Sequence, residues 1–359
     1  MQRTHHPHTL TLWLIVVLVF LVGGWTLQSC HDQVPAVPDP ANAVYYWRQE
    51  LTLSPYERTW LQEHKVRKLY LHLFDVERNH EGQLQPRTTL SVSDLPPTGI
   101  KVIPVVFLQH ELMQDTTGLT ALPQLITRRV QAMMEQNGLG PLTELQVDFD
   151  WTRRNQPRYY TFLKMMRESL QRLSPTPVRL SATIRLHQLQ MDAPPVDYGA
   201  LMVYNVGRIQ SIDEECSILP ESELQPYLRH LSSYPLPLCT ALPVYSWDLL
   251  FHDREFRHIV RGLDLQDTTL FQRIDSTHYQ AIRYQPIPPG GVSMRGDGRI
   301  YPGDIIRHEW VTPQVLLSVR QKLLRLRPSA CQQVILYHLD SQQLKQYNDE
   351  DIHTLFTGH

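Results

Sequence analysis

The sequence predicts an α/β protein built on a (β/α)8, TIM-like barrel. Three observations lead to this prediction. Short apolar, β-branched or aromatic runs alternate with longer amphipathic stretches over residues 43–359, as is typical of parallel strands joined by helices. The strand candidates number eight, and a segment of this length is normal for a barrel with insertions. No Gly-rich phosphate loop follows an early strand, which argues against a dinucleotide-binding fold.

The individual elements follow from local sequence patterns. Ser54 is a good N-cap for the first helix, and Pro55 suits its first position. The second and third helices carry apolar residues at spacings of three and four. Strands are expected at residues 43–47, 68–75, 102–108, 144–150, 178–184, 200–205, 238–244 and 334–338. Helices are expected at residues 55–64, 122–135, 157–173, 221–231, 253–263 and 313–326.

Residues 263–310 break this alternation, because they contain no clear helical pattern. Segments 269–274 and 278–283 are predicted to pair as a hairpin, and the turn residues 301–304 lead into a further strand. We therefore expect a small β-rich insertion before the last βα unit of the barrel.

The first thirty residues differ from the rest of the chain. Their apolar run, residues 12–22, covers roughly half of a bilayer core, which takes about 20 helical residues. The segment Leu27-Gln28-Ser29-Cys30 then resembles a bacterial lipobox, the site at which a lipoprotein precursor is cleaved and acylated. The resemblance implies a signal peptide over residues 1–29, a lipidated Cys30 and an extended tether over residues 30–42, which carries prolines.

An uncleaved signal anchor that spans the membrane with residues 10–27 is the alternative. Either arrangement places the remainder of the chain outside the cytoplasm. The expected location is the cell envelope, at the outer membrane or on the periplasmic face, with the membrane as a partner through the lipid anchor.

Composition narrows the classes of function. The formal net charge is −2 and no basic run occurs, so nucleic-acid binding has no electrostatic support. Cys216, Cys239 and Cys331 allow at most one internal disulfide. No metal-ligand spacing such as H-x-x-x-H occurs, and we expect neither a metal nor a cofactor. A metal-dependent deacetylase would require His72, Asp148 and His338 to converge.

The strongest candidate for chemistry is the fourth predicted strand. Side chains alternate along a strand, so Gln146, Asp148 and Asp150 share one face, which we expect to point into the barrel. Two carboxylates stacked there repel each other, and one should hold its proton near neutral pH, as a general acid must. The alternative is a pair of strand-end Asp residues that hydrogen-bonds a loop.

Two further strand ends carry a family resemblance. The segments Met202-Val203-Tyr204-Asn205 and Pro243-Val244-Tyr245, taken with Asp148-Phe149-Asp150, resemble the chitinase-like, family 18 glycoside hydrolases. That family has D-x-x-D-x-D-x-E on strand four, M-x-Y-D on strand six and G-x-P-x-Y on strand seven. The resemblance implies that Met202 and Tyr204 lie beneath the reacting sugar, that Asn205 replaces an Asp and that Tyr245 lines the pocket floor.

The catalytic Glu of that family pattern is not matched. In one register Thr152 occupies the position of the acid, and in the other Asp150 does, one methylene shorter. A displacement of roughly 1 Å can cost about 100-fold in rate. The sequence therefore leaves open a divergent hydrolase, with Asp150 as acid, Asp148 as its partner and Tyr204 holding the substrate, and a sugar-binding protein without catalysis.

Other strand-end side chains complete the predicted site. Trp47 and Trp247 lie just past strand ends, where flat rings can stack on sugars. Tyr70, His72 and Phe74 share a face, so His72 is expected to point inward. Arg185 is expected to pair with a strand-four Asp and keep it ionised. The expected partner is a glycan or oligosaccharide.

Three longer segments, residues 45–48, 67–76 and 180–188, are similar to a group of uncharacterised bacterial lipoproteins. This similarity implies no activity. A third interpretation therefore stays open beside hydrolase and sugar binder: a component of envelope assembly that docks through the β-rich insertion.

Overall fold

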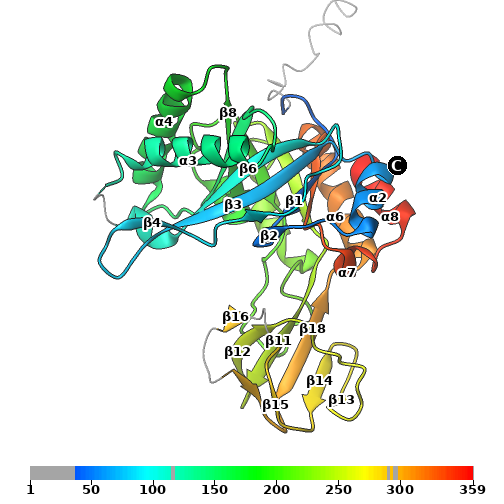
Figure 1. Ribbon diagram of the computed structural model, residues 1–359. Helices are drawn as coiled ribbons and strands as arrows, with labels where there is room; N and C mark the ends of the chain where they lie inside the picture. Colours follow the sequence, from blue (N-terminus) through cyan, green and yellow to red (C-terminus); the bar gives the residue numbers. More distant parts are fainter. Residues whose placement is uncertain (1–36, 115–117, 289–291, 294–297, 359) are drawn as a thin grey trace, which may run out of the picture. The chain divides into compact units, whose positions relative to one another are not determined.

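The computed structural model describes residues 37–114, 118–288, 292–293 and 298–358 (Figure 1). The predicted signal peptide, Cys30 and most of the predicted tether lie outside these residues. Within the described ranges, no helix combines the length and the apolar character needed to cross a membrane.

Eight parallel strands form a closed barrel, as the sequence predicted. Neighbouring strands pair in parallel around the ring, and β1 closes it by pairing with both β19 and β3. In ring order they are β1 (Ala43–Tyr46), β19 (Val334–Tyr337), β10 (Leu238–Pro243), β9 (Tyr198–Met202), β8 (Arg179–Arg185), β7 (Glu144–Asp148), β6 (Lys101–Leu108) and β3 (Lys68–Arg78).

Helices cover the outside of the barrel. Ser54 Oγ accepts from Glu57 N, and the Glu57 carboxylate accepts from Ser54 N, so the predicted cap of the first helix is confirmed. That helix and the last one lie side by side, with the rings of Trp60 and Phe356 6.4 Å apart (Figure 1). The α-helices are α2 (Pro55–Glu63), α3 (Leu122–Gln136), α4 (Gln156–Leu173), α5 (Gln225–Leu228), α6 (Pro313–Leu326), α7 (Ser341–Leu344) and α8 (Asp349–Thr357). The 3-10 turns are η1 (His110–Met113), η2 (Leu186–Gln190), η3 (Glu221–Glu223) and η4 (Pro328–Cys331).

The single helix predicted over residues 221–231 is wrong. The chain forms η3 and then the short α5, whose first turn contains Pro226. A proline has no N–H to donate and crowds the carbonyl four residues before it, so a helix cannot continue through it from Glu221 without a break.

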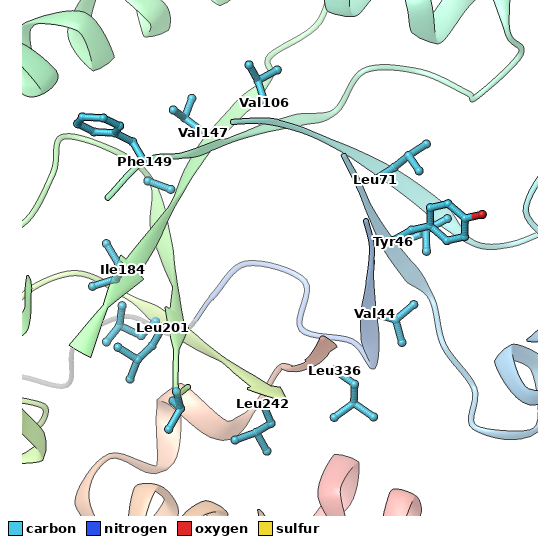
Figure 2. Close-up of a cluster of buried hydrophobic side chains, with 14 of the residues drawn as sticks. Val44, Tyr46, Leu71, Val106, Val147, Phe149, Ile184, Leu201, Leu242 and Leu336 are labelled. Atoms are coloured by element: carbon cyan, nitrogen blue, oxygen red, sulfur yellow. The ribbon is translucent and has the colours of Figure 1, made fainter. Parts of the chain in front are cut away.

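Alternation along the strands separates two cores. Side chains such as Val44, Val106 and Leu336 point outward from the ring toward the helices (Figure 2). Tyr45 and Tyr70 point inward and are fully buried in the barrel interior. Complete burial of one aliphatic side chain contributes roughly 1.5–3 kcal/mol, so the outer cluster is the main source of stability.

One strand departs from simple alternation. The pairing of β3 with β6 shifts register between His72 and Phe74. Phe74 therefore lies in the outer core, and the expectation that it shares an inward face with His72 is wrong. The same shift brings Asp75 to the mouth of the barrel, because a bulge redirects the side chains that follow it.

The lower barrel interior holds a buried hydrogen-bonded network. Lys68 Nζ donates to Gln333 Oε1 over 2.8 Å, and Gln333 Nε2 donates to Tyr70 OH over 2.9 Å. The hydroxyls of Tyr70 and Tyr198 are 2.7 Å apart, and Tyr198 OH donates to Glu144. Burial lowers the pKa of Lys68 and raises the pKa of Glu144. Each group is buried with partners, as polar groups in an interior require.

The chain enters the fold at the N-terminal ends of the strands. Val37 is buried in the interior cluster, and the backbone oxygen of Asp39 accepts from Lys68 Nζ. The backbone oxygen of Asn42 accepts from Arg67 N over 2.9 Å. Residues 37–42, predicted as part of an extended tether, therefore close the floor of the barrel, because an apolar side chain there is stabilised by burial.

The β-rich insertion is present and begins earlier than predicted. It starts at Ser246, directly after the barrel strand β10, and its order is β13-β14-β18-β11-β12-β16. The helix predicted over residues 253–263 is wrong. Asp253 and Arg254 both have positive φ, which suits a two-residue hairpin turn between β11 and β12. The predicted hairpin of β13 with β14 and the strand after residue 304 are confirmed.

The remaining strands complete the insertion and the edge of the barrel. All pairs in the six-stranded sheet are antiparallel. Two short pairs join β2 to β5 and β15 to β17, and β4 pairs antiparallel with the end of β3. The insertion strands are β11 (Ser246–His252), β12 (Glu255–Val260), β13 (Phe271–Arg273), β14 (His278–Ala281), β15 (Gln285–Pro286), β16 (Val292–Ser293), β17 (Arg299–Ile300) and β18 (Ile305–Trp310). The others are β2 (Glu50–Leu51), β4 (Leu84–Arg87) and β5 (Ser91–Val92).

Candidate functional site

A cleft of about 960 Å³ opens at the C-terminal ends of the barrel strands. Active sites of such barrels lie at this end. The insertion forms one wall, through residues 246–248, 260–264 and 308. Eight of the predicted site residues line the cleft: Trp47, Asp148, Arg185, Met202, Tyr204, Asn205, Tyr245 and Trp247.

Asp148 lies in the cleft with its carboxylate already engaged. Its Oδ1 accepts from Thr183 Oγ1 over 2.6 Å and from Arg185 Nη2 over 2.8 Å. The predicted pairing of Arg185 with a strand-four Asp is therefore confirmed. Burial lowers the pKa of Arg185, but the charges of Asp148, Tyr204 and Asp150, with the hydrogen bond to Asp148, together outweigh this and raise it above the ordinary value. The pair stabilises the charged form of Arg185.

Asp150 lies outside the cleft. Its side chain is 58% exposed, Gln188 Nε2 donates to Oδ1 over 3.1 Å, and His187 Nε2 is 3.4 Å away. Thr152, the other candidate for the acid position, is also exposed. The expectation of two carboxylates stacked inside the barrel is wrong, because β7 ends at Asp148 and strand alternation ends with it.

Aromatic rings form the floor of the cleft. The ring of Tyr204 stacks on Tyr337 at 5.3 Å, and Tyr245 meets Tyr204 edge-on at 6.2 Å. Tyr245 OH donates to Asn205 Oδ1 over 2.7 Å, and Tyr204 OH lies 3.1 Å from Met202 Sδ. Strand alternation could have identified Tyr337, since β19 places it inward, two residues after Ile335.

Trp47 covers His72. The two rings are parallel within 22° and 4.4 Å apart, and His72 is 2% exposed. His72 Nε2 is hydrogen-bonded to Asp75 Oδ1 over 2.8 Å. His72 points inward as predicted but does not line the cleft, whereas Asp75 and Trp47 do. The buried imidazole of His72 thus packs under the indole of Trp47 and holds it in place.

Glu309 joins the insertion to the barrel. It accepts from Trp247 Nε1 over 2.9 Å and from Ser217 N over 2.8 Å, and it pairs with Arg307 Nη2 at 2.5 Å. Arg307 also donates to the carbonyls of Ser211 and Ile209, in the loop after β9. These contacts fix the indole of Trp247 at the edge of the cleft.

Sequence reasoning missed the wall that the insertion contributes. His308 Nδ1 is 2.7 Å from Asp248 Oδ1, and both residues line the cleft with Arg261. No motif pointed to them, because the pairing of β11 with β18 brings together residues 60 positions apart. His338, considered from the sequence only as a member of a metal site, also lines the cleft and is 9% exposed.

The described residues offer no metal site: no three His, Cys, Asp or Glu side chains gather in a geometry that could hold an ion. The convergence of His72, Asp148 and His338 that a deacetylase would need is therefore not found among them. Cys216, Cys239 and Cys331 are all free thiols.

Comparison with known proteins gives likenesses in fold. No protein-family model matches the chain, and no curated protein matches it. The structure is similar to a chitinase from Chromobacterium violaceum, with 11% identity, a TM-score of 0.49 and coverage of 88% of this chain and 98% of that one. It is also similar to the family 18 chitinase of Cycas revoluta, with 10% identity, a TM-score of 0.48 and coverage of 89% of this chain and 99% of that one. A third similar structure is the spore cortex-lytic enzyme SleL of Bacillus cereus, with 12% identity, a TM-score of 0.45 and coverage of 86% of this chain and 75% of that one. At such low sequence identity these similarities concern the fold alone. The barrel is assigned from the strand order of this chain.

Replacement of Glu309 by Ala should strongly destabilise the protein. Arg307 is fully buried, and loss of its partner leaves an uncompensated charge, which costs about 3–5 kcal/mol. Denaturant unfolding monitored by circular dichroism measures the change. Asp213→Ala is the control, because it removes the exposed Arg254–Asp213 pair, worth about 0–1 kcal/mol. Equal losses of unfolding free energy in the two variants would contradict the role of Glu309 as the partner of the buried Arg307.

His338 should make stability depend on pH. Burial lowers its pKa to about 4, below the value of about 6.5 expected in the unfolded chain. The unfolded chain therefore binds the proton first, so the contribution is complete above pH 6.5 and is lost as pH falls toward 4. We expect His338→Gln to reduce the slope of unfolding free energy against pH in this window, by up to about 1.4 kcal/mol per pH unit. A His338 imidazole titrating near pH 6.5 by NMR would contradict this.

Proposed function

We propose that this protein binds a glycan in the barrel cleft and does not cleave glycosidic bonds with its strand-four carboxylates. One observation carries the proposal: rings from several strand ends gather around the engaged Asp148–Arg185 pair. Trp47, Phe107, Tyr204, Tyr245, Trp247 and Tyr337 all line the cleft.

The combination of flat rings and polar groups suits a sugar. Ring faces pack on the C–H surfaces of a pyranose, while carboxylates, guanidinium groups and amides exchange hydrogen bonds with hydroxyls. The volume of about 960 Å³ favours an oligosaccharide over a single sugar, because small-ligand sites span roughly 300–1,000 Å³. The resemblance of the three strand-end segments to chitinase-like hydrolases agrees with this class of ligand.

The positions of the carboxylates favour binding over glycosidic cleavage. Glycoside hydrolysis ordinarily uses two carboxyl groups that flank the bond, one of them a proton donor. Asp148 is held by Arg185 and Thr183 as an acceptor, and Asp150 lies outside the cleft lining. Among the cleft-lining carboxylates, Asp75 and Asp248 are each bound to a histidine.

Loss of an aromatic platform should abolish tight binding. For Trp247→Ala and Trp47→Ala we expect a loss of about 30-fold or more in affinity, since a buried Trp at an interface contributes about 2 kcal/mol or more. The full-length chain is screened against a glycan panel, and Kd is then measured by tryptophan fluorescence or calorimetry. Asp150→Asn is the matched control and should bind like the wild type, because Asp150 is exposed and outside the cleft.

The same screen tests the absence of glycosidic cleavage. Reducing ends released by the wild type, but not by Asp148→Asn, would show that the strand-four carboxylate is catalytic. Unchanged affinity in both Trp variants would remove the cleft from glycan binding altogether.

The proposal includes attachment to the cell envelope through Cys30. Its support is the sequence Leu27-Gln28-Ser29-Cys30 after a short apolar run. Cys30→Ser should move the protein from the membrane fraction to another fraction or leave it unprocessed, and should abolish labelling by a fatty-acid analogue. Cys216→Ser is the control, and its labelling should match the wild type. Incorporation of the label into Cys30→Ser would show that the anchor lies elsewhere.

A further inference from the structure

Two histidines line the cleft, and their surroundings differ. His338 is nine-tenths buried, and its Nδ1 has no hydrogen-bond partner in the described part of the chain. His308 is bound through Nδ1 to Asp248 Oδ1 over 2.7 Å. Asp248 and His308 face each other directly across β11 and β18. The pair is thus set by the register of the sheet, with both side chains on the cleft side.

The geometry of this pair suits proton transfer. The side chain of Asp248 is 10% exposed, whereas that of His308 is 34% exposed. With Nδ1 held by the carboxylate, Nε2 is the nitrogen left to exchange a proton with a molecule in the cleft. A buried carboxylate that orients an imidazole in this way fixes its tautomer and stabilises the imidazolium that forms.

Other His–Asp pairs in the described residues lack this access. His72 is covered by Trp47. His278 uses both ring nitrogens, one toward Asp275 and one toward the Ile212 carbonyl. His252 repeats the same contact, Nδ1 to Asp304 Oδ1 over 2.6 Å, but does not line the cleft. His252 is therefore a matched control for His308.

Arg261 supplies a positive charge on the same wall. It follows Val260, which pairs with Asp248 across β11 and β12, and it lines the cleft. Among the described residues it forms no ion pair, in contrast to the cleft residues Arg48 and Arg185. A base and a nearby cation are what the attack of water on an ester requires.

We propose that His308, oriented by Asp248, is a general base and that the cleft hydrolyses an ester group carried by the glycan it binds. This inference rests on the proposed function. His308 Nε2 takes a proton from water as the water oxygen bonds to the ester carbonyl carbon. The resulting oxyanion is stabilised by Arg261. The bond from that carbon to the sugar oxygen then breaks, and the sugar oxygen takes the proton from Nε2. The products are a free hydroxyl and a carboxylic acid.

An ester fits these residues better than a glycosidic bond. Breaking a glycosidic bond needs a protonated leaving group and a second carboxylate. An ester carbonyl needs an activated water and stabilisation of one developing negative charge. The imidazolium formed in the first step returns its proton to the leaving oxygen, so no further acid is required.

The test measures ester hydrolysis by the full-length protein. The probes are 4-methylumbelliferyl acetate and acetate release from O-acetylated cellohexaose and chitohexaose. We expect His308→Gln to lower kcat/KM by about 100-fold or more, the range of general-base catalysis, and Asp248→Asn to lower it at least tenfold. His252→Gln should retain the wild-type rate. Circular dichroism and Tm establish that each variant is folded.

Glycan affinity, measured on the same samples, separates the two proposals. A wild type that binds a glycan but hydrolyses esters no faster than His308→Gln overturns the esterase inference and leaves glycan binding standing. An equal loss in His252→Gln also overturns it, because surface imidazoles would then account for the rate. A wild type that binds no glycan overturns the proposed function, and with it this inference.

Discussion

Closure of the barrel at the β1–β3 pair is the constraint on which the rest of the structure depends. Once eight parallel strands form a ring, every second side chain must point to the axis, and those after the strand ends meet at one mouth. The interior thus becomes polar at the floor, around Lys68 and Glu144, and aromatic at the mouth, around Tyr204 and Tyr337. The polar floor and the aromatic mouth therefore both follow from ring closure.

The ion pair between Asp148 and Arg185 shows how ring closure determines the contacts of a side chain in the cleft. Adjacent strands β7 and β8 bring the two side chains together inside the mouth, and Thr183 adds a second donor to the same carboxylate oxygen. This carboxylate oxygen is therefore engaged as a hydrogen-bond acceptor. The cleft therefore combines aromatic walls with a strand-four carboxylate that is engaged in structural contacts.

Much of the barrel could be predicted from the sequence, because its eight strands are buried runs whose period is visible locally. The pairing of Arg185 with Asp148 was expected from the place of Arg185 at a strand end. The positions of Met202 and Tyr204 in the cleft were expected from the resemblance of their segment to chitinase-like hydrolases. The position of Asp150 did not, since nothing local marks where β7 stops. The β3 bulge depends on pairing with the separate strand β6, whereas the hairpin at Asp253 is local and its residues were assigned to a helix instead. The Asp248–His308 pair and the Glu309 contacts arise only when the insertion strands find their register.

The entry of the chain through the barrel floor has a consequence for access. Val37 and the carbonyl of Asp39 are bound among the first residues of the strands, whereas the cleft opens at the last ones. Residues 37–39 and the cleft therefore lie at opposite ends of the barrel strands. Because residues 37–42 close the floor, the cleft is entered from the C-terminal ends of the strands.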